Sequence, residues 1–346
     1  MHLVSNWRRM NILKKITVIV LFLLITPWLI YFVLTYKGLV LSSFAKNQLK
    51  GKILYSLISV PSIDIRSIDL PSGKRRIVYI SPLKGEEGYL SYVNSLSFSS
   101  DGRKVIFSRM GEESEGYRFK LCTMNIDGTD VSEFLELENM DLESPSWSPD
   151  GKRFAFIVQK PYGQGSLYVS NTDKPYSSLR AICNIRPSTM RLSWSPDGEN
   201  VSFVSDEHIS KEIRPGWRYE IFSGRAFIIN ADGSGLRSLE VDDTISWSPD
   251  GKLLLYRGKD GYYISNEDQT QAYLIIPYKR PPLSIFVGDP SFAVWSPDGR
   301  YIAYIKEIWP GMVTGIGIFV VPLDNPGHEI QVSVENHEVT EMIWVK

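Results

Sequence analysis

The sequence predicts an all-β fold, a six-bladed β-propeller, preceded by a single N-terminal transmembrane helix. Three observations support this prediction. A turn motif recurs five times at intervals of 47 to 53 residues, apolar runs of strand length follow each copy, and residues 16–36 contain no charged side chain. Of the 346 residues, 43% are hydrophobic and 12% are aromatic, so the chain can bury a large core.

The repeated motif is a hairpin turn with the consensus Ser-Trp-Ser-Pro-Asp-Gly. Its aromatic residues are, in chain order, Phe98, Trp147, Trp194, Trp247 and Trp295. Pro fits the second position of a type I turn, Asp is tolerated at the third, and Gly adopts the left-handed conformation that returns the chain to the next strand. We therefore interpret the motif as a structural joint, with the tryptophan packed between blades. The turn aspartates are Asp101, Asp150, Asp197, Asp250 and Asp298.

Each repeat supplies four strands, which is the content of one propeller blade. Apolar residues alternate with polar ones after each turn, and this period predicts strands with one buried face. Residues 53–80 contain three strand-like runs but not the first strand of a blade, whereas Trp344 lies 49 residues after Trp295, in register with the repeat. The C-terminal strand is therefore expected to complete the first blade and to close six blades over residues 53–346.

The five motif copies resemble the repeats of the TolB-like β-propeller family, whose unit centres on the same residues followed by a short hydrophobic strand. The resemblance covers residues 53–346 and implies the six-bladed fold. It implies less about activity, because such repeats occur in scaffolding proteins, in propellers fused to peptidases and in some lyases. Two departures are visible. Ser100 replaces Pro in the first copy, which weakens that turn, and the α/β domain of the namesake protein has no counterpart before residue 53.

Residues 16–36 are predicted to form a signal anchor, because 21 uncharged positions span about 30 Å of hydrocarbon at 1.5 Å per residue. A cleaved signal peptide and a buried helix of a soluble protein are the alternatives, but the run is longer than the apolar region of a cleaved signal. Four basic residues of the flank, residues 1–15, lie close before the run, whereas in the linker, residues 37–52, only Lys37 lies as close after it. We therefore expect a single-pass protein of the cell membrane with its propeller outside the cytoplasm.

Charge, cysteine content and missing motifs exclude several classes of function. Residues 1–52 hold eight basic and no acidic residues, which leaves residues 53–346 a formal charge of about −9, unfavourable for binding nucleic acid. Cys122 and Cys183 are interpreted as free core thiols, with a single disulfide as the alternative. The glutamates of segment 110–116 are interpreted as a solvated loop, with a divalent-ion site as the alternative. Zinc-ligand spacing, a nucleophile elbow and a glycine-rich phosphate loop are all missing, so neither a metal nor a cofactor is expected.

The candidate partner-binding surface is the face opposite to the motif turns, where the connections vary in length. The longest connection, residues 205–224, accounts for the 53-residue spacing and is rich in Trp, Tyr and Arg, which are enriched in binding hot spots. Two further variable connections are residues 278–291 and 306–317. The alternative is that their tryptophans pack locally against neighbouring loops. The candidate contacts are Arg214, Trp217, Arg218, Tyr219 and Trp309.

The function predicted from these features is that of a membrane-tethered, non-catalytic binding module, a monomeric propeller that recognises a protein or peptide at the cell envelope. The competing hypothesis is an extracytoplasmic enzyme of lyase or hydrolase type that acts on a carbohydrate or peptide in the central channel. Such an enzyme would need a metal held by His208, His328 or His337, which fall in different blades.

Overall fold

The computed structural model describes residues 48–59, 62–70, 72–80, 93–113, 116–137, 140–160, 164–186, 191–214, 217–241, 245–277, 292–308, 315–335 and 339–346. All regular elements in these ranges are β-strands, and the described residues include no helix long and apolar enough to cross a membrane. The membrane helix predicted for residues 16–36 lies outside the described residues, as do its basic flank and most of the linker.

The described strands form six four-stranded antiparallel sheets, which confirms the predicted all-β, six-bladed propeller. We number the blades along the chain and give the strands of each from the channel outward. Blade 1 contains β24 (Val339–Val345), β1 (Gly51–Ser59), β2 (Ser62–Leu70) and β3 (Lys74–Ile80). Blade 2 contains β4 (Val93–Phe98), β5 (Lys104–Glu113), β6 (Gly116–Asn125) and β7 (Ser132–Leu137). Blade 3 contains β8 (Asp141–Trp147), β9 (Arg153–Lys160), β10 (Gln164–Asn171) and β11 (Arg180–Ile185).

The second half of the ring repeats this order. Blade 4 contains β12 (Ser193–Trp194), β13 (Asn200–Arg214), β14 (Trp217–Asn230) and β15 (Arg237–Ser238). Blade 5 contains β16 (Ile245–Trp247), β17 (Leu253–Gly258), β18 (Gly261–Asn266) and β19 (Ala272–Pro277). Blade 6 contains β20 (Phe292–Trp295), β21 (Tyr301–Ile308), β22 (Gly315–Pro322) and β23 (Ile330–Glu335).

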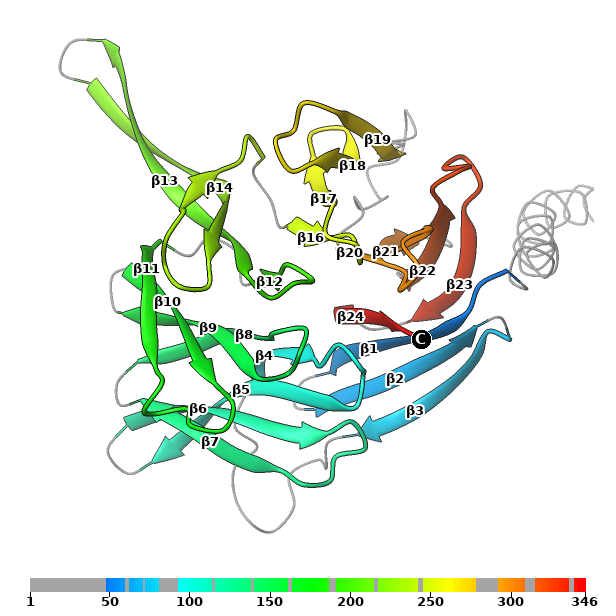
Figure 1. Cartoon of the computed structure of the whole chain (residues 1–346), viewed down its shortest axis with the longest axis horizontal. Coiled ribbons are helices and arrows are strands. Elements are labelled where there is room, and N and C mark those ends of the chain that lie inside the picture. Colours follow the sequence, from blue (N-terminus) through cyan, green and yellow to red (C-terminus); the bar gives the residue numbers. More distant parts are fainter. Residues whose placement is uncertain are drawn as a thin grey trace, which may run out of the picture.

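The blades are arranged in a ring around a central axis (Figure 1). Their inner strands contact one another in the cyclic order β24, β4, β8, β12, β16, β20 and back to β24. Strand β24 pairs antiparallel with β1, from Lys52 opposite Val345 to Leu57 opposite Val339. Blade 1 is therefore built from both ends of the described chain, and this pairing closes the ring.

Antiparallel pairing places successive connections at alternate ends of each blade. The motif turns, which join first to second strands, lie at the same end as the turns that join third to fourth strands; we call this end the turn face. Connections from second to third strands, and from one blade to the next, lie at the opposite end, the variable face. The inner strands therefore run from the variable face toward the turn face.

The five motif turns share one geometry. In each, the hydroxyl of the serine that follows the motif aromatic residue donates to the aspartate carboxylate at 2.5 to 2.7 Å, and that carboxylate accepts the amide two residues further on at 2.9 to 3.2 Å. The motif glycines have φ between +66° and +73°, a region that glycine enters without steric cost. In Asp150 the hydroxyl of Ser148 is the largest cause that holds the carboxyl pKa below its usual value. The aspartate side chains are thus engaged within their own turns.

Ser100, which stands where the other motif copies have proline, connects two neighbouring turns. Its hydroxyl donates to the Pro149 carbonyl oxygen of the next blade at 2.7 Å, a bond that proline cannot make. Its turn keeps the hydrogen bond from the Gly102 amide to the Ser99 carbonyl, at 2.8 Å. The departure from the motif therefore adds a contact between blades that the sequence did not predict.

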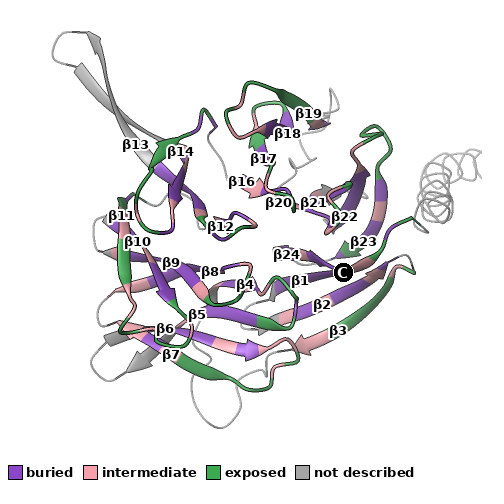
Figure 2. Ribbon diagram, in the orientation of Figure 1, coloured by how far each residue is buried: buried purple, intermediate pink, exposed green. Residues whose placement is uncertain are grey.

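The hydrophobic core consists of clusters between blades. Each of the six clusters among the described residues joins two adjacent blades. In β1, Leu54 packs against blade 2, whereas Ile53 and Tyr55 pack against blade 6. In β9, the five consecutive residues 154–158 have no exposed surface, and Figure 2 shows burial concentrated toward the channel. The prediction of one buried face is therefore wrong for these strands, because a sheet between two neighbouring sheets buries both faces.

The motif tryptophans pack between blades, as predicted. Trp194 lies in a cluster formed by blades 3 and 4, and its indole N–H donates to the Ser146 carbonyl of blade 3 at 3.1 Å. Trp295 donates in the same way to Ser246 of blade 5 at 3.2 Å. The guanidinium of Arg153 lies 5.2 Å from the Trp194 ring centroid, a cation–π contact between the same two blades.

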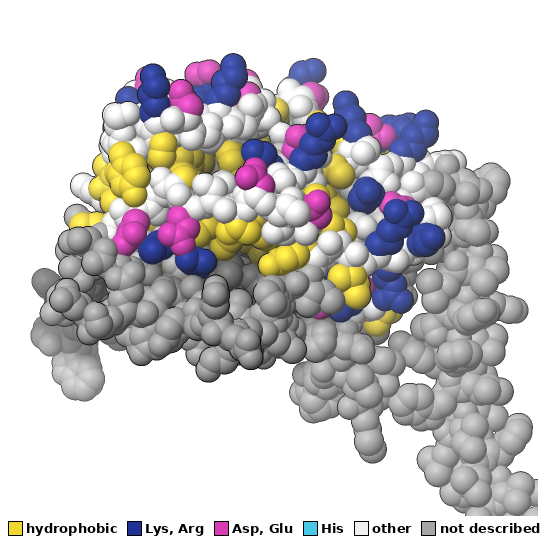
Figure 3. All heavy atoms as spheres, turned by 90° about the horizontal axis from the view of Figure 1, so that it is seen from below, with side chains coloured by type: hydrophobic (Ala, Val, Ile, Leu, Met, Phe, Trp, Pro, Cys, Tyr) yellow, Lys and Arg dark blue, Asp and Glu magenta, His cyan; other side chains and the backbone are white. Residues whose placement is uncertain are grey.

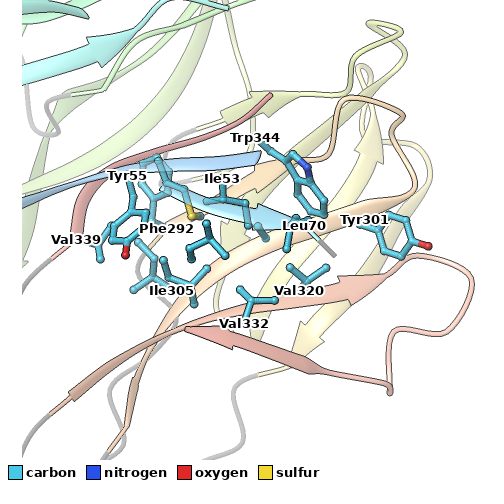
Figure 4. Packing of buried hydrophobic residues seen from close by; sticks show 14 of the residues in the cluster. Ile53, Tyr55, Leu70, Phe292, Tyr301, Ile305, Val320, Val332, Val339 and Trp344 are labelled. Carbon is cyan, nitrogen blue, oxygen red and sulfur yellow. The ribbon is translucent and has the colours of Figure 1, made fainter. Parts of the chain in front are cut away.

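The interface that closes the ring contains both apolar packing and a buried carboxylate. Figure 4 shows Tyr55 and Trp344 of blade 1 packed against Phe292 and other residues of blade 6. Beside them Glu335, at the end of β23, is 2% exposed. It accepts hydrogen bonds from the Tyr55 hydroxyl at 2.7 Å and the Arg66 guanidinium at 2.8 Å, and Arg75 lies at 3.3 Å.

Candidate functional site

A long hairpin arm distinguishes blade 4 from the other blades. The segment 205–224 was predicted as a long connection, but residues 205–214 and 217–224 of it are in fact strand: β13 has 15 residues and β14 has 14, and they pair from Asn200 opposite Asn230 to near the hairpin end. We call residues 206–214 and 217–224 the arm. Figure 1 shows it projecting from the body of the propeller. At about 3.3 Å per residue, nine residues carry its end roughly 30 Å from the blade.

The backbone of the arm has two outer edges without a strand partner among the described residues. Strand β12 pairs only with Val201 and Ser202 of β13, and β15 pairs only with Phe227 and Ile228 of β14. Unpaired strand edges are templates for pairing with another chain. The arm therefore presents two unpaired strand edges on the variable face.

The predicted contacts from this segment lie together at the end of the arm. Arg214 is opposite Trp217, Arg218 is opposite Glu212, and Tyr219 is opposite Lys211 in the strand register. Their side chains, like the whole of Trp309, lie outside what the structure describes. The position of these residues in the chain is thus established, and their role as contacts remains a prediction.

The three candidate histidines do not share one site. His208 belongs to the arm on the variable face, whereas His328 follows β22 in a turn at the turn face, where its amide donates to the Asn325 carbonyl at 3.0 Å. His337 lies outside the described residues. Over the described ranges no group of three or more His, Cys, Asp or Glu side chains is arranged to hold a metal ion. Because His208 and His328 lie at opposite faces, the metal site with all three histidines that the competing enzyme hypothesis would need is not formed.

The acidic segment and the cysteines also have defined places. Glu112 and Glu113 end β5 and belong to the paired hairpin of β5 and β6, so the expected solvated loop is instead largely strand; Glu115 lies outside the described residues.

Cys122 and Cys183 are free, the first buried and the second half-buried. Burial raises the pKa of the Cys122 thiol to about 11, so it remains protonated and unreactive at neutral pH.

A chamber of about 170 Å³ lies in the central channel, bounded by residues from all six blades. Its walls follow one column of the repeat, the position three residues before the motif aromatic residue. Among the described residues this column contains Ser95, Ser144, Arg191, Phe292 and Glu341. The position two residues further on, immediately before the aromatic, adds serines from three blades. Residues at the intervening position, among them Leu96, Leu192 and Ala293, also border the chamber.

Two side chains of opposite charge line the chamber. Arg191 comes from blade 4 and Glu341 from blade 1, which lie opposite each other in a ring of six. The guanidinium carbon of Arg191 is 3.8 Å from the ring centroid of Phe292, in blade 6, so this side chain reaches across the channel. Burial raises the pKa of the Glu341 carboxyl to about 7, and the nearby charge of Arg191 opposes that rise. Bulk water therefore screens these charges poorly.

Sequence reasoning missed Arg191 and Glu341, although a signal was present. Each residue stands three positions before a motif tryptophan, and alignment of the repeats on those tryptophans places both in one column. Most other members of the column are serine or phenylalanine, so charge at this position marks the two residues as unusual. On the face in Figure 3, basic and acidic side chains are intermingled.

Comparisons with known proteins agree with this architecture. No family model matches the chain. Dipeptidyl-peptidase 5 from Porphyromonas gingivalis is 26% identical over 225 residues, which are 64% of this chain and 31% of that protein. The Tol-Pal system protein TolB from Wigglesworthia glossinidia brevipalpis is 36% identical over 66 residues, which are 19% of this chain and 14% of that protein. This chain thus covers less than a third of the length of either relative.

Among solved structures, TolB from Acinetobacter baumannii superposes with a TM-score of 0.59 at 16% sequence identity, covering 85% of this chain and 66% of that chain. The fold is that of a TolB-like six-bladed β-propeller. At such low identity the likeness establishes the fold and not an activity. The arm and the chamber of this TolB-like propeller are therefore interpreted from its own residues.

Proposed function

We propose that this protein is a membrane-tethered, non-catalytic binding module whose propeller contacts a protein or peptide partner at the cell envelope. The arm is the observation that carries the proposal. It extends blade 4 beyond the other blades and presents two strand edges that no described strand covers. An extended partner segment adding to such an edge would gain main-chain hydrogen bonds.

The proposed contacts are Arg214, Trp217, Arg218 and Tyr219 at the end of the arm, together with Trp309. Trp, Tyr and Arg combine large contact area with hydrogen-bonding groups and dominate the energetics of many interfaces. The TolB-like fold supports a binding role, and the similarity to two Tol-Pal system TolB proteins supports the envelope as its place. Identification of the partner requires capture from the native membrane.

The location follows from the apolar run at residues 16–36, which we propose to be a single-pass anchor with the propeller outside the cytoplasm. A reporter that is active only in the cytoplasm, fused after Lys346, tests this orientation. We expect no reporter activity. Strong activity would reverse the topology, and a soluble chain that begins near Lys46 would replace the anchor with a cleaved signal.

The binding role is tested by cross-linking and affinity capture of the full chain from its native membrane. We expect a partner that is captured by the wild-type chain and is lost on Trp217→Ala or Arg218→Ala, because truncation of a hot-spot residue typically costs about 2 kcal/mol or more. Lys174→Ala, in an exposed turn on the opposite face, is the control and should capture the same partner. Retention of every partner by both arm variants would refute the assignment of the site.

A second candidate function rests on the similarity to dipeptidyl-peptidase 5, which covers 64% of this chain. In that case the propeller would belong to an enzyme of hydrolase type acting on peptides. Turnover of a dipeptide-releasing substrate by the purified full chain would favour it. The metal-dependent form of this hypothesis is disfavoured, since His208 and His328 lie at opposite faces.

A further inference from the structure

The outer edge of β14 is the side of the arm that faces away from the channel. Strand β14 is the third strand of blade 4, and β15 pairs only with Phe227 and Ile228, near the end of β14 that lies in the blade. The stretch 217–225 therefore has β13 on one side and no strand of the described residues on the other. A hairpin of two strands alone is marginally stable in water. An added strand along this edge would stabilise the arm.

The main-chain groups at this edge follow from the base of the strand. The Ala226 amide donates to the Val241 carbonyl, and the Ala226 carbonyl accepts from the Leu239 amide, both at 2.8 Å, so residue 226 directs both groups outward. Neighbouring residues of an antiparallel strand direct these groups to opposite sides, and β14 pairs with β13 without a shift from residue 226 to residue 218. The positions that present N–H and C=O groups at the free edge are thus 218, 220 and 222.

The composition of this strand favours pairing with another chain. Residues 217–224 read Trp-Arg-Tyr-Glu-Ile-Phe-Ser-Gly, which is rich in aromatic and β-branched types that fit strands. Proteins block exposed edges with proline and lysine, and this stretch contains neither. By contrast, β3, the outer strand of blade 1, begins with Lys74 and two exposed arginines. The free edge of β14 carries no such block.

Charge selects one register for a second copy of β14 that lies antiparallel on this edge. Hydrogen-bonded pairs form only between residues that direct their main-chain groups outward. A twofold axis at Arg218 or at Glu220 places like charges opposite each other, and an axis at Ile221 or Phe222 leaves both charges opposite uncharged residues. An axis at Tyr219 instead places Arg218 of each copy opposite Glu220 of the other, and cross-strand pairs of opposite charge stabilise a sheet.

From these observations we propose that the free edge of β14 pairs with the same edge of a second copy of this chain, antiparallel and with the twofold axis at Tyr219. The inference rests on the proposed function, whose binding arm it uses, and it names a second copy as the occupant of one of the two edges. It departs from the monomeric propeller expected from the sequence. The two arms then form one continuous sheet in the order β13, β14, β14, β13.

Arg218 and Glu220 each have one neighbour in their own hairpin and one in the second copy. Arg218 stands between Glu212 of its hairpin and Glu220 of the second copy, and a guanidinium has enough N–H donors for two carboxylates. Glu220 stands opposite Ser210 in its hairpin, so its basic cross-strand neighbour comes from the second copy. The overlap, residues 217–221, is short and predicts a weak dimer, which tethering to one membrane would favour by raising the local concentration.

Cysteine cross-linking of the purified full chain in detergent tests the register. At the twofold axis the two residues form a pair without hydrogen bonds, with Cα atoms about 4.5 Å apart, which a disulfide can span. Mild oxidation at about 100 μM chain should therefore convert Tyr219→Cys into a covalent dimer. Ile221→Cys is the matched control and should stay monomeric, because its counterpart lies roughly 14 Å away. The wild type controls for the native thiols of Cys122 and Cys183.

Charge reversal tests the pairing of Arg218 with Glu220. Two copies of Glu220→Arg would place like charges at both twofold-related pairs, and so would two copies of Arg218→Glu. We expect each variant to self-associate at least about ten-fold more weakly than the wild type in analytical ultracentrifugation. A mixture of the two variants should restore association, because both pairs again have opposite charges. Glu207→Arg makes the same change on β13 and should leave the dimer intact.

The proposal is overturned if Tyr219→Cys forms no covalent dimer under these conditions, or if Ile221→Cys forms one equally well. It is equally overturned if the mixture of folded charge variants associates no better than either variant alone. Circular dichroism shows whether each variant is folded, and the two cysteine variants decide if a charge variant is not. These measurements contain no other protein, whereas the capture experiment detects foreign partners, so the dimer and the proposed function can fail separately.

Discussion

At the scale of single residues, the turn aspartate is present in all five copies of the motif. In the turn of blade 3, Asp150 accepts from the Ser148 hydroxyl at 2.6 Å and from the Lys152 amide at 3.1 Å. The hydroxyl of Ser148 also accepts the Arg153 amide at 2.9 Å. A short local network therefore satisfies the polar groups where the chain reverses, which explains why Ser, Asp and Gly recur together.

Replacement of this carboxylate tests its structural role. We expect Asp150→Ala to lower the free energy of unfolding by about 0.5 to 2 kcal/mol, as loss of a comparable capping hydrogen bond does. Asp150→Asn keeps an acceptor oxygen and should lose less. Urea denaturation of both variants measures the difference, together with partner capture. Unchanged stability combined with lost capture would show that the motif is a binding site.

At the scale of elements, β8 is an inner strand whose pairing with the neighbouring strand β9 is interrupted. Its register with β9 shifts between Glu143 and Ser146, and the intervening Pro145 has no amide to donate to the ladder. The resulting bulge holds Glu143 at 6% exposure, where its carboxylate accepts from the Gln159 amide at 2.7 Å. Burial, followed by the charge of Asp141, raises the pKa of Glu143 to about 7.

A raised pKa in the folded state has a definite effect on stability. Between about pH 4.5 and pH 7 the folded protein holds a proton on Glu143 that the unfolded chain has released, so stability from this group falls as the pH rises through that window. Glu143→Gln removes the effect. We expect this variant to gain stability over the wild type between pH 4.5 and pH 8, by up to about 3 kcal/mol at the upper end.

Thermal unfolding of the wild type and Glu143→Gln at several pH values measures this difference. Glu240→Gln is an exposed control on blade 4 and corrects for the general effect of one lost charge. A stability difference that stays constant from acidic to alkaline pH would contradict the argument. In that case the carboxylate would be as well stabilised in the fold as in water.

At the scale of the whole molecule, the interface that closes the ring contains a buried carboxylate, that of Glu335. This carboxylate is contributed by blade 6 and is bound by Tyr55, Arg66 and Arg75 from three successive strands of blade 1. The aromatic packing of Figure 4 surrounds the same interface. Because β24 and β1 come from opposite ends of the described chain, this interface joins residues that are far apart in the sequence.

We expect Glu335→Ala to destabilise the propeller by about 1 to 3 kcal/mol, because it removes the buried acceptor of the Tyr55 hydroxyl, whereas Arg66 keeps its ion pair with Asp64. Arg300→Ala removes an exposed ion pair with Asp298 and should change stability far less, because water screens that pair. Urea denaturation monitored by tryptophan fluorescence compares the two. Equal and small effects would show that apolar packing alone closes the ring.

The sequence alone determined the repeat, the number of blades, the turn chemistry and the packing of the tryptophans between blades. These features depend on residues near one another in the chain, and a period of about 49 residues makes each of them visible several times. Only the tertiary structure showed that residues 206–214 and 217–224 are a paired arm, because a long hairpin and a long loop can share the same composition. The convergence of Arg191 and Glu341 also required it, since they are 150 residues apart and meet only because six blades close around one axis.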